Sequence, residues 1–134
     1  HPDTVPDNRY VADTGFMKGF IDLVFAWKDR YYIVDWKSNY LGNTADDYAP
    51  HVLPAVMISE HYRVQYHLYA VALDRYLSFR LPGYRYETHF GGVYYLFLRG
   101  INGDHHSRHG VYFDRPKEDT IARLAELLTS RLPL

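Results

Sequence analysis

Two short apolar runs lie only three residues apart near the start of the chain, and no other sequence feature restricts the fold as much. The first is KGFIDLVFAW at residues 18–27, the second is YYIVDWK at residues 31–37, and the polar triplet KDR separates them. Both runs are rich in aromatic and branched residues, which favour β-strands. Two strands joined by so short a polar turn form a hairpin.

The rest of the chain changes pattern several times. Residues 38–50 contain Ser, Asn, Gly, Asp and Pro, which indicate a loop. In residues 55–80 aromatic and apolar side chains recur at intervals of three and four, which predicts a helix. Residues 93–98 are continuously apolar, as in a strand covered on both faces; residues 111–113 suit a short edge strand, and residues 117–131 suit an amphipathic helix. This order predicts the α/β class, with a mixed β-sheet flanked by helices.

Composition narrows the class of protein. The 134 residues suffice for one domain with a core, and an apolar content of 47% excludes a disordered chain. The formal net charge of −1 gives no overall basic field, so contacts to nucleic acid must come from a local patch. The absence of cysteine excludes disulfides and thiolate metal sites and is compatible with the cytoplasm. Residues 1–14 are polar and start with His rather than Met, so we expect an arm or linker in a piece of a longer protein.

Three charged side chains in the hairpin could form one site. Asp22 interrupts the first apolar run, and a carboxylate buried there costs several kcal/mol unless it is paired or binds a cation. Asp35 and Lys37 lie on one face of the second strand, roughly 6.5 to 7 Å apart along it. A hairpin can bring Asp22 near Asp35, and two such carboxylates suit Mg²⁺ or Mn²⁺.

A metal held in this way supports phosphodiester hydrolysis, with Lys37 stabilising negative charge or orienting the attacking water. The residues alone leave simpler readings open. Asp35 and Lys37 also fit a surface ion pair at a strand end. Asp22 could pair with Lys18 or with Arg30.

Four stretches together resemble a known nuclease family. GFMKGFIDLVF, YYIVDWKSNYLG, QYHLYAVAL and HFGGVYYLFLRG follow one another between Gly15 and Gly100. They are similar to the RecB-type nuclease domains of the PD-(D/E)XK nuclease superfamily. The resemblance implies a restriction-endonuclease-like core over residues 15–134.

The resemblance also implies roles for hairpin residues. Asp22 matches the first metal-binding acid of the family, and Asp35 matches the second. Lys37 matches the catalytic lysine. The backbone carbonyl of Trp36 matches a position that can also bind the metal.

Gln65 and Tyr69 match the Gln-x-x-x-Tyr motif of RecB-type nucleases, on a helix that flanks the active site and helps to hold the DNA. From the residues alone, their i, i+4 spacing shows only that both reach one helix face. A packed face with a hydrogen-bonded amide is the other reading of this spacing.

The function implied by the resemblance is metal-dependent DNA cleavage, with Mg²⁺ as the expected ion, by an exodeoxyribonuclease V-type helicase-nuclease in double-strand-break repair. Family members carry a further His ligand and an acidic residue on a helical segment ahead of the hairpin. Residues before Asp22 do not match that segment, so we expect activity of this piece to depend on it. The alternative function is a docking module for RecC, RecD and RecA through residues 55–80 or 117–131.

Two further groups of polar residues fit either a binding site or a solvated surface. His105, His106 and His109 lie in a loop-like segment, which favours solvated side chains over a metal site. Residues 61–100 carry five arginines and two acids interleaved with tyrosines. This composition fits either a solvated face or a surface that binds single-stranded nucleic acid.

Overall fold

The fold is built on a four-stranded mixed sheet. The computed structural model describes residues 21–104 and 106–131, so the expected arm at 1–14, Lys18 and His105 lie outside the described residues. The strands β1 (Leu23–Trp27), β2 (Arg30–Lys37), β3 (Phe90–Phe97) and β4 (Val111–Asp114) are neighbours in this order. β2 and β3 are parallel, whereas β1 pairs with β2 and β4 with β3 in the antiparallel sense. The mixed α/β sheet predicted from the sequence is confirmed.

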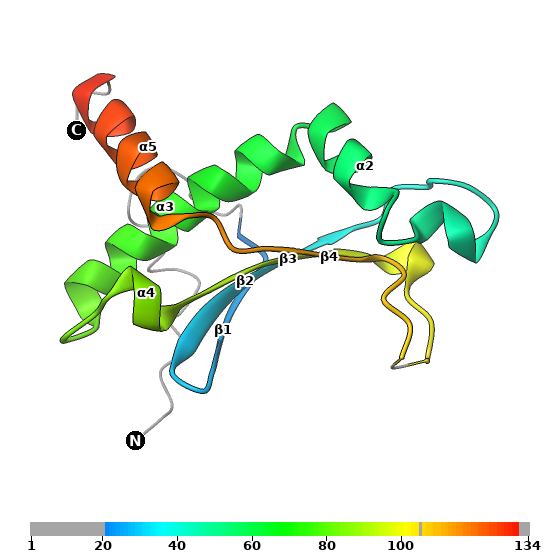
Figure 1. Ribbon diagram of the computed structural model, residues 1–134, viewed down its shortest axis with the longest axis horizontal. Helices are drawn as coiled ribbons and strands as arrows, with labels where there is room; N and C mark the ends of the chain where they lie inside the picture. Colours follow the sequence, from blue (N-terminus) through cyan, green and yellow to red (C-terminus); the bar gives the residue numbers. More distant parts are fainter. Residues whose placement is uncertain (1–20, 105, 132–134) are drawn as a thin grey trace.

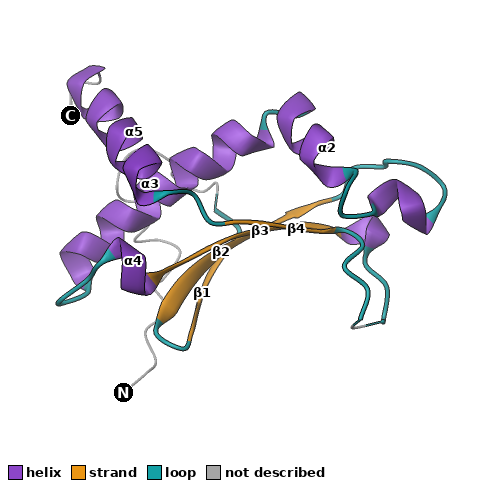
Figure 2. Ribbon diagram, viewed as in Figure 1, coloured by secondary structure: helices purple, strands orange, loops and turns teal. Residues whose placement is uncertain are grey.

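Within the described residues, four α-helices and two 3₁₀ helices accompany these strands, and the last helix follows β4. The α-helices are α2 (Leu53–Ser59), α3 (Tyr62–Arg80), α4 (Tyr86–His89) and α5 (Glu118–Arg131), and the 3₁₀ helices are η1 (Ala45–Tyr48) and η2 (Leu98–Gly100). Figures 1 and 2 show α2, α3 and α5 on one side of the sheet. Within the described part of the chain, no helix has the length and apolar character that crossing a bilayer requires.

The hairpin turn consists of two residues in the left-handed region. Trp27 pairs with Arg30, and Lys28 and Asp29 between them have φ angles of 50° and 63°. Two-residue turns with positive φ match the right-handed twist of the adjoining strands. The turn therefore fixes the register of β1 against β2, on which the site described below depends.

The helix predicted over residues 55–80 is two helices. α2 ends at Ser59, and His61 adopts a left-handed conformation with φ 60° and ψ 20° before α3 begins. No Gly or Pro marks this break in the sequence, and no residue between Met57 of α2 and Tyr66 of α3 is fully buried. Periodicity reports which side chains are buried and does not report where the chain changes direction.

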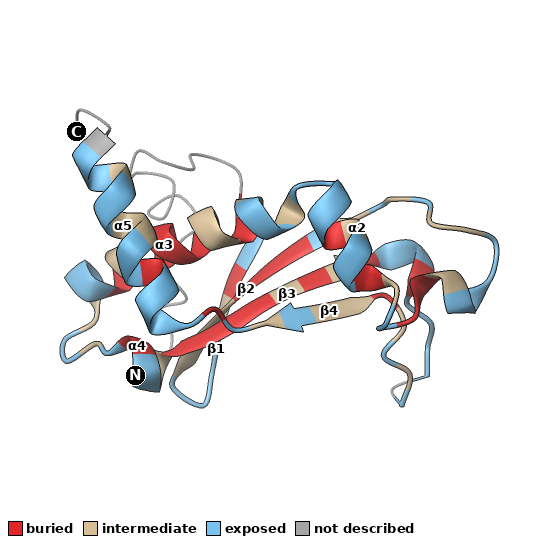
Figure 3. Cartoon of the chain, turned by 45° about the horizontal axis from the view of Figure 1, so that its top comes forward, coloured by how far each residue is buried: buried red, intermediate tan, exposed pale blue. Residues whose placement is uncertain are grey.

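The central strands carry the core beneath α3. Figure 3 shows buried residues concentrated along β2 and β3 and on α3. On β3, Val93, Tyr95 and Phe97 are fully buried, whereas Tyr94 and Leu96 between them are only half-buried. The expectation that both faces of this strand are covered is wrong for the described residues, since the helices lie on one side only.

The second face of the sheet is occupied by a row of aromatic side chains. Neighbouring ring centroids are 5.0, 6.0 and 4.7 Å apart in the order Phe25, Tyr32, Tyr94 and Phe113, one residue from each strand. A side chain on Gly91 would place its Cβ 2.5 Å from the Tyr32 ring, and one on Gly92 would lie 2.5 Å from Phe113. The two glycines therefore make room for the row, and the aromatic content explains the continuous apolar run in β3.

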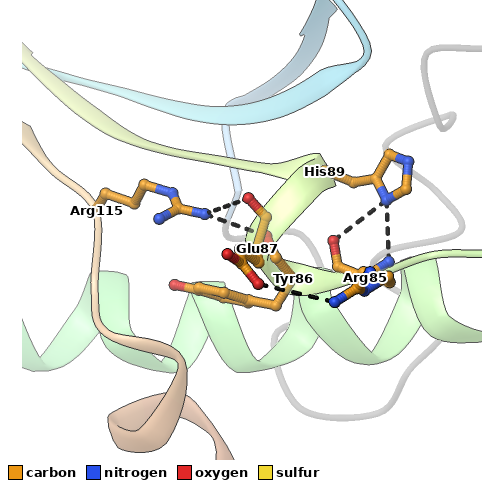
Figure 4. Close-up of polar contacts among 5 residues, drawn as sticks. All are labelled: Arg85, Tyr86, Glu87, His89 and Arg115. Atoms are coloured by element: carbon orange, nitrogen blue, oxygen red, sulfur yellow. Dashed lines mark hydrogen bonds and ion pairs between the residues drawn. The ribbon is translucent and has the colours of Figure 1, made fainter.

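An arginine ties the end of β4 to the start of β3. Arg115 Nε donates a hydrogen bond to the carbonyl of Phe90 at 2.9 Å, and Nη2 donates to those of Tyr86 at 3.2 Å and Glu87 at 3.0 Å. Figure 4 shows its guanidinium directed at the backbone of α4. These bonds join β4, α4 and β3 at one corner of the sheet.

We expect Arg115→Ala to lower the free energy of unfolding by about 1.5 kcal/mol, the lower end of the range for charged hydrogen bonds, because the side chain is exposed. Urea unfolding measures the change. Arg85→Ala is the matched control, since its ion pair with Glu87 is long, at 3.8 Å, and exposed, and should contribute less than about 0.5 kcal/mol. Equal losses in the two variants would contradict this role for Arg115.

Candidate active site

The hairpin register brings the two predicted acids to the same end of the sheet. Leu23 pairs with Val34, and one further step along both strands sets Asp22 across from Asp35. Asp22 Oδ2 accepts a hydrogen bond from the backbone N–H of Trp36 at 3.0 Å. The carboxylate of Asp22 is therefore fixed where β1 and β2 separate.

One sequence-based expectation for Asp22 and one alternative are wrong. It is exposed rather than buried in an apolar strand, because β1 begins only at Leu23 and Asp22 lies at the open end of the hairpin. Its pairing with Arg30 is excluded by the register, since Arg30 faces Trp27 at the opposite end of the hairpin. Lys18, the other suggested partner, lies outside the described residues.

Asp35 and Lys37 share one face of β2 and form a buried ion pair. Lys37 Nζ lies 3.0 Å from Asp35 Oδ1, and Asp35 is only 3% exposed. The ammonium group also lies over two aromatic rings, 4.3 Å from the centre of Tyr62 and 5.4 Å from that of Tyr95. The alternative of a solvated surface pair is wrong, because α3 and β3 supply these rings as walls around the lysine.

The electrostatics of Asp35 favour binding of a cation. Burial raises the pKa of its carboxyl group above the ordinary 3.8; the contact and charge of Lys37 oppose this rise, and the negative charge of Asp22 adds to it. Among the described residues the polar neighbour of the buried Asp35 Oδ1 is Lys37 Nζ at 3.0 Å, which leaves the second lone pair of this oxygen unused. A buried carboxylate oxygen with an unused lone pair is a candidate metal ligand.

Gln65 and Tyr69 project from α3 toward the same region. Gln65 Oε1 accepts a hydrogen bond from Tyr95 Oη at 2.5 Å. Burial raises the pKa of Tyr69, and the negative charges of Asp35 and Asp22 raise it further, so the hydroxyl stays protonated beside both acids. The structure thus places Gln65 and Tyr69 near Asp35 and Asp22. The hydrogen bond of the Gln65 amide also agrees with the alternative prediction of a packed helix face.

Sequence reasoning missed the part played by Tyr95 and Tyr62. Tyr95 lies next to Asp35 in the parallel register between β2 and β3, and Tyr62 opens α3 with its hydroxyl donating to Asn39 Oδ1 at 3.0 Å. Parallel pairing of distant strands leaves no local signal in a sequence, whereas the spacing of Asp35 and Lys37 does. The one available hint was the high tyrosine content of the predicted helix and of the third strand.

The remaining predicted residues lie as follows. Trp36 presents an exposed side chain on the face opposite to Asp35 and Lys37, and its backbone N–H holds Asp22. His109 belongs to a loop, where its Nδ1 contacts Ser107 Oγ at 2.9 Å. Within residues 21–104 and 106–131 no group of three or more His, Asp or Glu side chains is placed to hold a metal.

A divalent cation fits the donors that are present. Asp22 and Asp35 offer carboxylate oxygens at one end of the hairpin, and Asp35 Oδ1 has an unused lone pair. Oxygen-only ligation is what Mg²⁺ and Mn²⁺ prefer. Two acids leave most coordination positions to water, backbone carbonyls and substrate oxygens, as is usual for Mg²⁺.

Comparisons with known proteins identify the family and relatives of the chain. A family model for the PD-(D/E)XK nuclease superfamily matches residues 6–133. The RecBCD enzyme subunit RecB of Escherichia coli (strain K12) is 45% identical over 122 residues, 91% of this chain and 10% of that protein. The RecBCD enzyme subunits RecB of Haemophilus influenzae and Mycolicibacterium smegmatis are 49% and 39% identical over 82% and 89% of this chain. The chain spans about a tenth of the length of these relatives.

The pKa of Asp35 predicts a pH-dependent effect on stability. A carboxyl group with a raised pKa binds its proton more tightly in the folded state, so stability falls as pH rises from 3.8 through the raised value. Asp35→Asn removes this loss. The free energy of unfolding of the variant, minus that of the wild type, should therefore increase in urea titrations as pH rises from 3.8 through the raised pKa.

Asp47→Asn is the control with the opposite sign. The backbone N–H and the hydroxyl of Thr44 both donate to Asp47 and lower the pKa of its carboxyl group. Asp47 therefore stabilises the fold above 3.8, and this contribution is lost as pH falls through the lowered value. The same slope in both variants would contradict the assignment for Asp35.

Proposed function

The chain belongs to the PD-(D/E)XK nuclease superfamily, and we propose that it hydrolyses phosphodiester bonds in DNA with a divalent cation held by Asp22 and Asp35. The observation that carries this proposal is the buried carboxylate of Asp35, with an unused lone pair, beside the enclosed ammonium of Lys37. A structural ion pair with Lys37 uses one lone pair of Asp35 Oδ1 and gives no reason to leave the other without a partner. A cation ligand gives one.

Each residue of the site has a role in this proposal. A bound divalent cation supplies a coordinated water of lowered pKa and polarises a phosphate oxygen. Asp22 and Asp35 hold the ion, with the carbonyl of Trp36 as a further ligand. Lys37, positioned by Asp35 and two tyrosine rings, stabilises negative charge that develops on the phosphate. We expect Mg²⁺ as the ion and Mn²⁺ as its substitute.

The neighbouring helix positions the substrate. Gln65 and Tyr69 lie on the face of α3 turned toward the acids and are proposed to help to hold the DNA. The two side chains differ in reach: Tyr69 is fully buried, while Gln65 is half-buried and already bonded to Tyr95. Gln65 is therefore the residue of this pair that a DNA backbone could contact directly.

The similarity to the RecB subunit suggests the setting of this activity. We propose that the chain is the nuclease part of a helicase-nuclease of the exodeoxyribonuclease V type, acting with RecC and RecD in the cytoplasm on DNA that the helicase delivers. Its biological role would be double-strand-break repair and recombination. The nuclease chemistry would then depend on the rest of the subunit for DNA supply.

A second candidate function is docking of a partner protein. A hollow of about 510 Å³ is lined by residues of α2, α3 and α5 and the turn between the first two. The lining residues are mostly apolar or histidine: Ile58, His61, Arg63, Val64, His67, Leu68 and Leu124. Ile58 and Val64 are both well exposed. Exposed apolar side chains around a hollow favour a docking site for RecA, RecC or RecD over a purely solvated face.

For the nuclease proposal, we expect Asp35→Asn and Lys37→Gln to lower the rate of DNA cleavage at least about 100-fold, because each removes a charge that acts on the reacting phosphate. Nucleotide release from end-labelled DNA in Mg²⁺ measures the rate in the helicase-nuclease complex, where DNA unwinding should persist. Asp119→Asn, an exposed acid on α5, should cleave at the wild-type rate. Calorimetry with Mn²⁺ should show binding that Asp22→Ala abolishes. Undiminished cleavage by Asp35→Asn would refute the proposal.

For the docking candidate, we expect Val64→Asp to abolish capture of purified RecA, RecC or RecD by the immobilised protein, because a charge in the hollow must be desolvated on binding. Leu127→Asp, an exposed apolar residue of α5 outside the hollow, should bind as the wild type does. Asp35→Asn should also bind normally, which separates docking from cleavage. Capture that survives Val64→Asp would remove this candidate.

A further inference from the structure

A second hollow lies at the end of the sheet where Lys37 is located. The loop that follows β2 and the turn that follows β3 enclose a space of about 350 Å³. Figure 1 shows these two segments at the same end of the molecule. Because β2 and β3 are parallel and end together, at Lys37 and Phe97, the hollow lies at the end of the sheet that carries Lys37, although none of its lining residues belongs to the candidate site.

The floor of this hollow is preformed. Tyr48 is buried and contacts Gly100 so closely that a Cβ on the glycine would lie 2.4 Å from the tyrosine Cβ. The backbone N–H of Leu41 donates to Tyr48 Oη at 3.1 Å. Asp47 Oδ2 accepts from both the backbone N–H and the hydroxyl of Thr44, each at 2.9 Å, which holds the loop in place. A rigid hollow loses little conformational entropy when a ligand binds.

The walls offer a planar ring and a positioned cation. Tyr40 is 61% exposed, and its hydroxyl donates to Asn43 Oδ1, which leaves the Asn43 amino group as a donor. Arg99 Nε donates to the carbonyl of Ser38 at 2.8 Å, so its Nη groups remain as donors for a ligand. Asn102 adds a second amide, and the described residues lining the hollow include no acid.

Three features of this lining define the ligand. The lining includes an exposed ring, Tyr40, and a guanidinium, Arg99, and this combination fits an aromatic base joined to a phosphate. The volume is near the lower end of the range for small-molecule sites, about 300–1,000 Å³, which suits one nucleotide rather than several. A base can stack on a protein ring only when it has left its neighbours, which selects single-stranded nucleic acid over duplex.

We propose that this hollow is a nucleotide subsite, in which the base stacks on Tyr40 and its phosphate binds Arg99, adjoining the position of the phosphate that is cut. Arg99 is bonded to Ser38, the residue after Lys37, so a strand held in the hollow continues toward the lysine. The subsite rests on the proposed nuclease function for its meaning, but its binding of a strand does not require the cation.

The test is to measure, by fluorescence anisotropy, the binding of a fluorescent oligodeoxythymidylate to the protein in EDTA, where no cleavage occurs. We expect Tyr40→Ala to weaken binding about tenfold, since base stacking on an aromatic residue contributes strongly to affinity. Tyr40→Phe, which keeps the ring, should bind as tightly as the wild type. Arg99→Ala should weaken binding and reduce the salt dependence by about one phosphate contact.

Matched controls use residues far from the hollow. Phe79 is 82% exposed near the end of α3, and Arg123 is exposed on α5, so Phe79→Ala and Arg123→Ala should leave affinity unchanged. Equal affinities of Tyr40→Ala and Phe79→Ala, or no binding by the wild type, would overturn the subsite. Circular dichroism of every variant checks that the fold is retained.

Two further measurements separate the sources of affinity. An oligonucleotide of abasic residues should bind the wild type as weakly as the thymidylate binds Tyr40→Ala. Competition by thymidine monophosphate should exceed that by inorganic phosphate, and equal competition would reduce the hollow to an anion site and refute base recognition. Asp35→Asn should bind normally while its cleavage is lost. If Tyr40→Ala binds the oligonucleotide as tightly as the wild type does, while Asp35→Asn abolishes cleavage, the subsite is refuted and the nuclease proposal remains. If Tyr40→Ala weakens binding but Asp35→Asn still cleaves DNA, the nuclease proposal is refuted and the subsite remains.

Discussion

The ion pair between Asp35 and Lys37 sets the demands that the rest of the structure meets. Placing two opposite charges at the inner face of a sheet is costly unless their surroundings compensate for the lost water. Here the ammonium lies over Tyr62 and Tyr95, and those rings come from α3 and β3. The parallel pairing of β2 with β3 is therefore part of the site, because it brings Tyr95 next to Asp35.

The sequence was sufficient wherever the information was local. The hairpin follows from two β-favouring runs around a polar turn, and the shared face of Asp35 and Lys37 follows from strand alternation. Features that depend on contacts between distant parts of the chain could not be predicted from the sequence. No Gly or Pro marks the break at His61, and the exposure of Asp22 depends on where β1 begins. The hydrogen bond between Tyr95 and Gln65 joins residues that are 30 positions apart. Roles for the site residues came from the resemblance, because spacing alone does not distinguish a metal ligand from a paired or packed side chain.

Rigid elements surround the candidate site on each side. β2 carries the ion pair, α3 carries Gln65 and Tyr69, and the loop after β2 is fixed by Tyr48 and Asp47. Sites built on such elements hold their side chains closely enough for catalysis, whereas long unsupported loops do not. The two hollows lie on different parts of this frame, one formed by the segments that follow β2 and β3 and one on the helical layer.

The hydrogen bond from the Trp36 N–H to Asp22 has a consequence for how the hairpin ends. The amide of Trp36 points toward the first strand, where continued pairing would give it a backbone carbonyl as its partner; a side-chain oxygen takes that place instead. The side chain of Asp22 thus ends the backbone hydrogen bonding between β1 and β2 at Trp36. Asp22→Asn would keep a side-chain oxygen that accepts this hydrogen bond but would remove the charge, whereas Asp22→Ala would remove both. The two substitutions therefore separate the effect of the hydrogen bond on the end of the hairpin from the effect of the charge.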